Sequence, residues 1–151
     1  MGNYHVRQMK PADYEAVYCL WKTIRGFGIR SIDDSREGVE RFIYRNPTTS
    51  IVAESDGRIV GCILCGHDGR CGCFYHVCVA EDYRKRGIGK AMAVTAMKAL
   101  QAEHINKVCL IAYKNNEAGN GFWKSVGWKK REDINYYDFN LNDENITRFN
   151  S

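Results

Sequence analysis

The residues with the clearest chemical meaning lie in one stretch, RKRGIGKAM, over positions 84–92. Backbone N–H groups in the first turn of a helix have no partner within that helix, and they form the positive end of its dipole. Glycine lets the backbone approach a ligand closely because it has no Cβ atom. An apolar helical pattern begins inside this stretch, so we expect it to bind an anion with two adjacent phosphates. Its basic residues are Arg84, Lys85, Arg86 and Lys90, and its glycines are Gly87 and Gly89.

Two common phosphate-binding motifs do not fit this stretch. A P-loop needs a glycine five positions before its Gly-Lys pair and Ser or Thr after it, whereas these positions hold Arg84 and Ala91. A dinucleotide-binding fingerprint needs a third glycine where Met92 stands, and it opens a parallel strand–helix–strand unit. The stretch follows apparent hairpins instead. The sequence therefore indicates another kind of phosphate ligand.

The composition is typical of one soluble globular domain over residues 1–151, with 44% apolar and 26% charged residues. The formal charge of +4 is small for a dedicated nucleic-acid binder, and an anionic ligand is enough to explain it. No apolar run reaches the roughly 20 residues that span a bilayer, and the start lacks the apolar stretch of a signal peptide. We therefore expect a cytoplasmic domain with no nucleic-acid partner and no membrane span.

Seven cysteines without a secretion signal indicate reduced thiols rather than a disulfide framework. Cys62, Cys65, Cys71 and Cys73 form a CxxC and a CxC pattern that could supply four thiolates to zinc. Residues three apart on an extended strand point to opposite faces, however. We expect these side chains to serve as small buried hydrophobic groups, and we expect no metal.

Hydrophobic periodicity predicts the elements that must position the glycine-rich stretch. Asp56-Gly57 and Asp68-Gly69 are hairpin signals, so the three strands around them are expected to form an antiparallel meander. Asp34 or Ser35 can cap the second helix. The order indicates a mixed α/β sheet. Strands are expected at 4–9, 50–54, 58–66, 71–80 and 108–113 and as a pair within 128–141, and helices at 11–24, 34–46, 87–103 and 116–126.

Two motifs resemble those of the GCN5-related N-acetyltransferase (GNAT) superfamily. Arg84, Gly87 and Gly89, directly after FYHVCVAEDY, are similar to its acetyl-CoA signature, Arg-x-x-Gly-x-Gly. The predicted order of elements also matches this α/β fold from end to end, so the resemblance covers the chain as one domain. The second motif runs from the end of the fifth strand through the last helix and comprises Asn116, Phe122-Trp123 and Gly127-Trp128.

The resemblance implies transfer of an acetyl group from acetyl-CoA to a primary amine of a small molecule or a protein. The diphosphate would lie on backbone N–H groups from Arg84 to Gly89, and the pantetheine arm would follow the fourth strand. The N–H of Val79, at a β-bulge, would bond the thioester oxygen and stabilise its developing charge. The implied cofactor-binding residues are Val77, Val79, Arg84, Lys85, Arg86, Gly87, Ile88, Gly89, Lys90, Asn116, Phe122 and Trp123.

The residues that would accept the proton of the amine are expected close to Val79. Glu81 is the carboxylate nearest to it in sequence, and Tyr75 would share a strand face with Val77 and Val79. Tyr75 could bond the amine or a relaying water. Alternation places His76 on the opposite face from Tyr75, so we expect His76 to be structural.

The leaving thiolate lacks the usual proton donor of the superfamily. Many members have a tyrosine in the last helix, at the position that Trp123 occupies here. An indole N–H can donate a hydrogen bond but cannot act as an acid at neutral pH. The thiolate would leave unassisted, or Tyr113 or water would protonate it.

Two other functions stay open, and the acceptor is not determined. A missing acid is compatible with an acyl-CoA-binding module without efficient turnover. A small nucleic-acid binder would show salt-dependent affinity and ignore CoA, although the basic residues cluster at one helix start. The acceptors left open are protein N-termini, lysines, polyamines, amino acids and drugs. We expect residues 21–34 and 133–139 to select the acceptor, with Phe27, Tyr136 and Tyr137 as candidate walls, and a homodimer is the commonest assembly of the superfamily.

Overall fold

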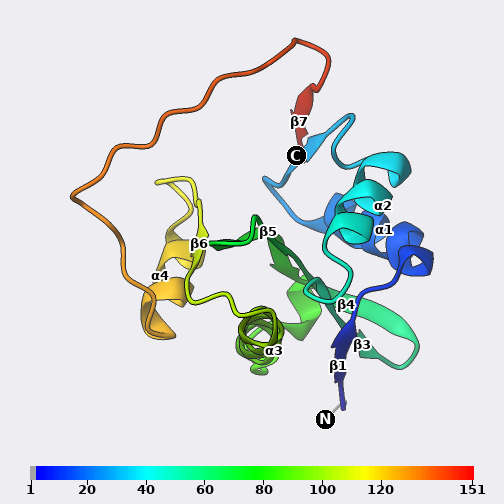
Figure 1. The fold of residues 1–151 in the computed structure, drawn as a ribbon. Helices are drawn as coiled ribbons and strands as arrows, with labels where there is room; N and C mark the ends of the chain where they lie inside the picture. The colour runs from blue at the N-terminus through cyan, green and yellow to red at the C-terminus, as the bar shows by residue number, and fades with distance from the viewer. Residues whose placement is uncertain (1–2) are drawn as a thin grey trace.

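A five-stranded mixed sheet organises the chain, of which the computed structural model describes residues 3–151 (Figure 1). The strands lie in the order β1-β3-β4-β5-β6, and neighbours are antiparallel except for the parallel pair β5 and β6. This arrangement confirms the predicted mixed α/β class. The strands of this sheet are β1 (His5–Gln8), β3 (Ile51–Ser55), β4 (Arg58–His67), β5 (Gly72–Val79) and β6 (Val108–Leu110).

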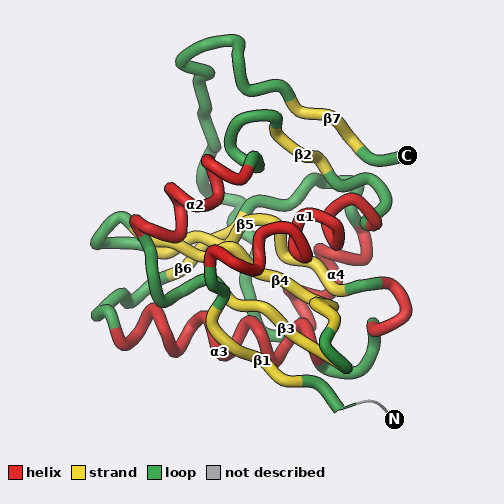
Figure 2. Tube along the Cα trace, turned by 90° about the vertical axis from the view of Figure 1, so that its right-hand side faces the viewer, coloured by secondary structure: helices red, strands yellow, loops and turns green. Residues whose placement is uncertain are grey.

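Helices cover both faces of the sheet (Figure 2). On one face, Phe42 of α2 meets Tyr75 of β5 at 5.9 Å between ring centroids. On the other face, Trp123 of α4 meets Phe74 of β5 at 6.0 Å. Adjacent residues of β5 thus face different helical layers. The helices are α1 (Tyr14–Thr23), α2 (Arg36–Arg45), α3 (Ile88–Ala102) and α4 (Glu117–Ser125), with 3-10 turns η1 (Pro11–Asp13) and η2 (Glu81–Tyr83).

The central strands β3 and β4 are buried almost throughout, which explains their nearly continuous apolar sequences. Glycines on β4 let helices approach both faces closely. A Cβ atom at Gly61 would lie 2.8 Å from Cε of Met92 in α3, and one at Gly66 would lie 2.6 Å from Nδ2 of Asn46, which follows α2. The structure confirms the antiparallel meander that the sequence predicts for 50–54, 58–66 and 71–80.

A β-bulge interrupts β5 in the middle of the sheet. Tyr75 pairs with Leu64 and Cys78 pairs with Cys62, so two residues of β5 stand opposite Ile63. One of these two is His76, whose φ of +51° lies in the left-handed region. Histidine is among the residues that enter this region more often than most. The bulge shifts the alternation of side chains along the rest of β5.

This shift makes three sequence predictions for β5 wrong. Tyr75 faces α2, whereas Val79 faces α3 and lies 3.8 Å from a Cβ atom built on Gly89. Val77 lies two residues before Val79 and shares its face, because side chains alternate along a strand. Tyr75 therefore shares a face with neither valine. His76 packs against α1, on the same side as Tyr75, and the bulge lies at His76 rather than at Val79. The prediction assumed uninterrupted alternation, and one inserted residue reverses every face beyond it.

The C-terminal region does not form the two strands predicted within 128–141. The described chain has no strand in this range, and the segment arcs away from the sheet before it returns to β7 (Figure 1). Alternating side chains form a strand only when a partner strand or an apolar layer lies opposite them. Here the apolar side chains are 59–86% exposed, namely those of Ile134, Tyr136, Tyr137 and Phe139.

A second, two-stranded sheet joins the middle of the chain to its C-terminal part. β2 (Gly28–Arg30) pairs antiparallel with β7 (Thr147–Phe149), and the sequence predicts neither strand. The predicted strand over 108–113 is shorter in the structure and ends at Leu110. The unpredicted pair β2 and β7 and the early end of β6 are thus the two main differences from the predicted strands outside the range 128–141.

The ion pair between Arg7 and Asp13 makes the stability sensitive to acid. Arg7 donates two hydrogen bonds of 2.8 Å to the carboxylate of Asp13, and these bonds lower the pKa of Asp13. Such a group stabilises the fold above its unfolded pKa of about 3.9, and the contribution is lost as the pH falls through the lower folded value. Asp13→Asn is expected to cost about 1 kcal/mol at neutral pH and to reduce the decline of unfolding free energy below about pH 4.

Urea titrations at several pH values measure both effects. Asp138→Asn, on the exposed C-terminal segment, is the matched control and should change neither the stability nor its pH dependence. If the unfolding free energy of Asp13→Asn fell below about pH 4 as steeply as that of the wild type, Asp13 would not be the group responsible for the decline.

Gly38 of α2 allows the preceding loop to fold tightly over the start of the helix. A Cβ atom at Gly38 would collide with the backbone oxygens of Ile32 and Asp33. Backbone cannot yield as a flexible side chain does, so Gly38→Ala is expected to destabilise the protein by about 2 kcal/mol. Thermal melting measures the loss. Gly121→Ala in α4, where a Cβ atom meets nothing within 4 Å, should leave the melting temperature unchanged or raise it. Equal melting temperatures would refute this role of Gly38.

Candidate functional site

The start of α3 presents backbone donors without partners. Gly87 is the N-cap residue with a φ of +83°, and no side chain caps this end of the helix. The first backbone bond back along the helix runs from the N–H of Ala91 to the oxygen of Gly87, at 3.0 Å. The N–H groups of Ile88, Gly89 and Lys90 therefore point out of the helix end. This is the backbone geometry that the sequence predicts at the junction, and such a helix start can donate hydrogen bonds from its N–H groups to an anion.

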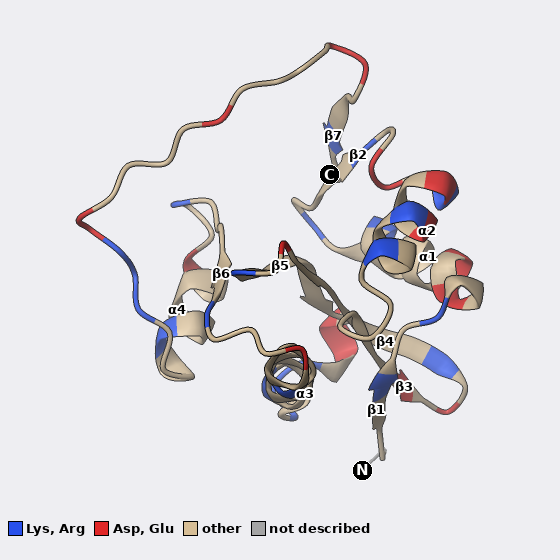
Figure 3. Cartoon of the chain, in the orientation of Figure 1, with Lys and Arg blue, Asp and Glu red and all other residues tan. Residues whose placement is uncertain are grey.

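Basic residues occupy the loop before this helix start and its first turn, namely Arg84, Lys85, Arg86 and Lys90 (Figure 3). Nε of Arg84 donates to the backbone oxygen of Val79 at 3.0 Å, and Nη2 of Arg86 donates to a backbone oxygen of η2 at 3.0 Å. Both guanidinium groups thus fix the shape of the loop between β5 and α3. Lys85 and Lys90 are exposed beside it. The junction is positively charged and is tied to the end of β5.

The motif at the start of α4, which includes Asn116 and Phe122, packs against the glycine-rich motif at the start of α3. A Cβ atom at Gly89 would lie 3.2 Å from Cζ of Phe122, so the ring of Phe122 packs on the first turn of α3. Asn116 caps α4, because its Oδ1 accepts the N–H of Gly119 at 3.1 Å. The structure therefore brings together two stretches that are about thirty residues apart in the sequence.

Trp123 belongs to an aromatic cluster between α4 and β5. Its ring lies 4.9 Å from Phe122, 6.0 Å from Phe74 and 4.8 Å from Trp128. Such contacts stabilise the packing of α4 on the sheet. At the position where many members of the superfamily have a tyrosine that protonates the thiolate, this protein therefore has an indole that packs between α4 and β5.

β5 and β6 separate beyond a short parallel contact. They pair only over Gly72–Phe74, and no ladder joins their later residues in the described chain. The N–H of Ala80 bonds to Val60 on the other neighbouring strand at 2.8 Å. Because N–H directions alternate along a strand, those of Val77 and Val79 point away from β4, toward the gap beside β6. The gap is lined by backbone donors near the anion site.

The predicted proton-moving residues do not lie together. Tyr75 is 50% exposed, and burial and the neighbouring Cys73 raise its pKa, so its phenol stays protonated near neutral pH and can only donate or relay. Glu81 begins η2 beyond the end of β5, and its carboxylate is exposed. The structure therefore places the two predicted groups on different parts of the fold.

A surface cleft of about 310 Å³ is formed in part by the chain that follows β6. Its walls are Gly26, Tyr113, Asn115 and Phe149. Phe149 reaches this position through the β2–β7 pairing and packs on Tyr113 at 6.0 Å between centroids. Of these residues, Tyr113 is predicted from the sequence as a proton donor to the thiolate, and Gly26 lies in the range 21–34 that is predicted to select the acceptor.

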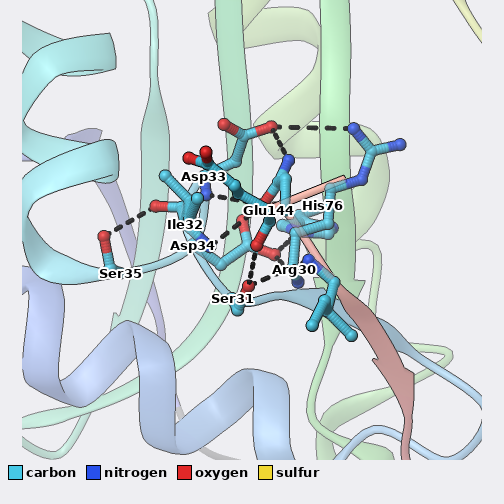
Figure 4. Close-up of polar contacts among 10 residues, drawn as sticks. Arg30, Ser31, Ile32, Asp33, Asp34, Ser35, His76 and Glu144 are labelled. Atoms are coloured by element: carbon cyan, nitrogen blue, oxygen red, sulfur yellow. Dashed lines mark hydrogen bonds and ion pairs between the residues drawn. The ribbon is translucent and has the colours of Figure 1, made fainter. Parts of the chain in front are cut away.

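His76 and Asp34 form a hydrogen-bonded pair beneath the loop before α2 (Figure 4). Nε2 of His76 lies 2.8 Å from Oδ2 of Asp34, which also accepts the N–H of Arg30 at 2.7 Å. Ser35, rather than Asp34, caps α2 through the N–H of Gly38. The sequence offered both residues as caps, and only the fold shows that Asp34 turns toward β5.

The cysteines are all free thiols in this structure. Burial raises the pKa of Cys62, and it raises those of Cys65 and Cys78 to about 12, as expected for small buried groups. Among residues 3–151, no three or more His, Cys, Asp or Glu side chains form a group that could hold a metal ion. Within the same residues, every helix is too short or too polar to cross a bilayer.

Solved structures share this fold, and two of them are acetyltransferases bound to coenzyme A or to an analogue of it. The PaiA N-acetyltransferase of Thermoplasma acidophilum, in complex with coenzyme A, aligns over 98% of both chains with a TM-score of 0.73 and 15% identity. The aminoglycoside acetyltransferase AAC(6')-Iy, in complex with a bisubstrate analogue, aligns over 92% of this chain and 99% of its own, with a TM-score of 0.72 and 15% identity. At this identity, the likeness concerns the fold.

Sequence relatives define the family. An acetyltransferase of Pectobacterium atrosepticum is 32% identical over 124 residues, which are 82% of this chain and 86% of the relative. An acetyltransferase of Sodalis glossinidius is 30% identical over 129 residues, 85% of this chain and 89% of the relative. The model of the acetyltransferase (GNAT) family matches residues 14–128. The chain belongs to this family and is an acetyltransferase.

Proposed function

We propose that the protein transfers the acetyl group of acetyl-CoA to a primary amine. The observation that carries this proposal is the placement of an uncapped helix start, at Gly87–Lys90, beside a strand edge whose N–H groups are free of β4. A ligand with a diphosphate at one end and a thioester at the other matches this pair of sites. The CoA bound to the PaiA neighbour supports the choice of ligand.

The diphosphate would accept hydrogen bonds from the N–H groups at the start of α3, with Lys85 and Lys90 as nearby cations. The arm of the ligand would pass between Gly89 and Phe122 on one side and the edge of β5 on the other. Val77 and Val79 offer their N–H groups along this edge. Asn116 and Trp123 would contribute by holding α4 in place, since both pack or cap that helix.

The reaction needs a neutral amine and a stabilised oxyanion. The amine nitrogen attacks the thioester carbon after its ammonium form has lost a proton. The negative charge that builds on the thioester oxygen would be bonded by the N–H of Val79. The nitrogen of the adduct then loses its second proton to water, the C–S bond breaks, and the CoA thiolate leaves. Tyr113, at the edge of the gap, or water would protonate it, because Trp123 cannot.

The cleft between Tyr113 and Phe149 is the proposed entrance for the acceptor. Two aromatic rings flank it, and such faces attract an ammonium group. A primary amine on a small molecule or on a protein would fit this chemistry. The bisubstrate complex of AAC(6')-Iy supports an acceptor route in this fold. The single-domain organisation, the cytoplasmic location and a homodimer stay predictions.

Thiol release with a panel of amines tests this function. The protein is mixed with acetyl-CoA and with spermidine, lysine, a lysine-containing peptide or an aminoglycoside, and the product is identified by mass. We expect free thiol and an acetylated amine in stoichiometric amounts with at least one acceptor, and no product with a tertiary amine. Binding of acetyl-CoA without release for every acceptor would instead identify an acyl-CoA-binding module.

A further inference from the structure

We propose that His76 is the catalytic base that accepts the proton of the amine and that Asp34 is a positioning residue for its imidazole. The inference rests on the proposed transfer to an amine. It replaces Glu81 and Tyr75, which the sequence predicted for this part of the reaction.

The hydrogen bonds fix which imidazole nitrogen can act as a base. Asp34 is 3% exposed, and its Oδ2 accepts from the backbone N–H of Arg30 and lies 2.8 Å from Nε2 of His76. A carboxylate can only accept, so Nε2 carries the hydrogen and Nδ1 keeps its lone pair. Among residues 3–151, no group forms a hydrogen bond with Nδ1. This is the arrangement in which a buried carboxylate orients a histidine base.

The imidazole is also held by its neighbours. Its ring lies 4.8 Å from Trp21 and 4.6 Å from Phe27, and the His76 side chain is 19% exposed. The loop that carries Asp34 is fixed in turn, because Tyr14 bonds to the backbone oxygen of Asp34 at 2.7 Å. The segment around Glu144 bonds to the same loop (Figure 4). A base held in one orientation needs little reorganisation during proton transfer.

The bulge brings this ring to the acceptor side of the sheet. The left-handed backbone of His76 turns the side chain toward α1 and toward Phe27, which follows directly on the cleft residue Gly26. His76 lies three residues before Val79, a distance of about 10 Å along a strand. The proposal therefore places the attacking amine between the imidazole and the thioester, with its nitrogen bonded to Nδ1 directly or through one water.

The proton balance of the step is simple. The ammonium form of the acceptor gives one proton to Nδ1 of His76, and the resulting amine attacks the thioester carbon. The imidazolium is stabilised by the carboxylate of Asp34 across the 2.8 Å contact. After the attack the nitrogen carries a second proton that it must lose, and this proton passes to water or to the departing CoA thiolate as the C–S bond breaks. The imidazolium releases the first proton to water, which regenerates the base.

The other titratable groups around His76 stay neutral in the range where the base works. Burial raises the pKa of Tyr14 on α1 and that of Tyr75 beside His76. Burial also raises the pKa of Cys62 on β4, and it raises that of Cys78 on β5 to about 12. The pH profiles of the wild type and of the His76 variants are therefore compared, because the ionisation of the acceptor amine is common to both.

The test combines a pH profile with a measurement that does not depend on activity. His76→Gln keeps an amide that can bond to Asp34 but cannot accept a proton, and His76→Asn suits the left-handed backbone better. With acetyl-CoA and the best amine of the panel, we expect both variants to lower kcat/KM about 100-fold at neutral pH and to lose the fall in rate toward acid. Asp34→Asn should give a smaller loss. His67→Gln, whose imidazole pairs with Glu103 away from this site, is the matched control.

Nitrogen-15 NMR of the wild-type imidazoles provides the second measurement. The signal absent from His76→Gln should show hydrogen on Nε2 and none on Nδ1, and Asp34→Asn should disturb this tautomer. Calorimetry should give wild-type affinity for acetyl-CoA in all variants. Wild-type rates in both His76 variants, or hydrogen on Nδ1, would overturn the proposal. If the wild type binds acetyl-CoA but releases no thiol, the proposed function fails, while the tautomer still tests the pair.

Discussion

Replacing Gly87 with asparagine and Gly89 with valine together is expected to weaken acetyl-CoA binding by about 100-fold or more, a loss of about 2.7 kcal/mol. Asparagine tolerates the left-handed backbone at position 87, where φ is +83°, so the loop keeps its shape while a side chain enters the mouth of the anion site. Valine at position 89 would extend from a Cβ atom that already lies 3.2 Å from Phe122 and 3.8 Å from Val79. The variant therefore fills the passage between α3, α4 and β5.

Isothermal titration calorimetry with acetyl-CoA measures this loss, and thermal melting confirms that the variant is folded. Gly121→Val is the matched control, because a Cβ atom at this position meets no atom within 4 Å. It should bind acetyl-CoA as the wild type does. A folded double variant with unchanged affinity would exclude the start of α3 as the diphosphate site.

Val79→Pro is expected to lower kcat by about 100-fold or more while acetyl-CoA still binds, because proline lacks the N–H that would stabilise the oxyanion. The register supports this choice of residue. Ala80 and Cys78 face Val60 and Cys62 of β4, so the N–H of Val79 takes no part in that ladder. Replacing this N–H by the proline ring therefore breaks none of the hydrogen bonds between β5 and β4.

Val79→Ala separates the N–H from the side chain, since alanine keeps the donor and loses only two methyl groups. Its kcat should stay within a few-fold of the wild type. Steady-state kinetics at saturating acetyl-CoA compare the two variants, with binding measured separately. Equal rates for Val79→Pro and Val79→Ala would show that another group stabilises the oxyanion.

The uncapped start of α3, which is the proposed anion site, could be predicted from the sequence because its parts are consecutive. Glycine at position 87, the basic residues around it and the helix that follows are local features, and their geometry follows from backbone rules. The same holds for the antiparallel meander, whose Asp-Gly turns and apolar runs determine the pairing of neighbours. The fold class and the helix start were therefore accessible without coordinates.

The acceptor side could not be predicted because it depends on long-range contacts and on one irregularity. The bulge at His76 reverses the faces of β5, and strict alternation gave the wrong side for Tyr75 relative to Val79. β2 and β7 are three residues each, too short for any periodicity, and they come from distant parts of the chain. The role of Asp34 was hidden because an acidic residue before a helix is also a good cap.

A crystal structure of the protein with acetyl-CoA tests the central claim most directly. The account predicts diphosphate oxygens within hydrogen-bond distance of the N–H groups of Ile88, Gly89 and Lys90. It also predicts the thioester oxygen at the N–H of Val79, in the gap between β5 and β6. A diphosphate bound away from the start of α3, or a thioester far from this strand edge, would contradict it.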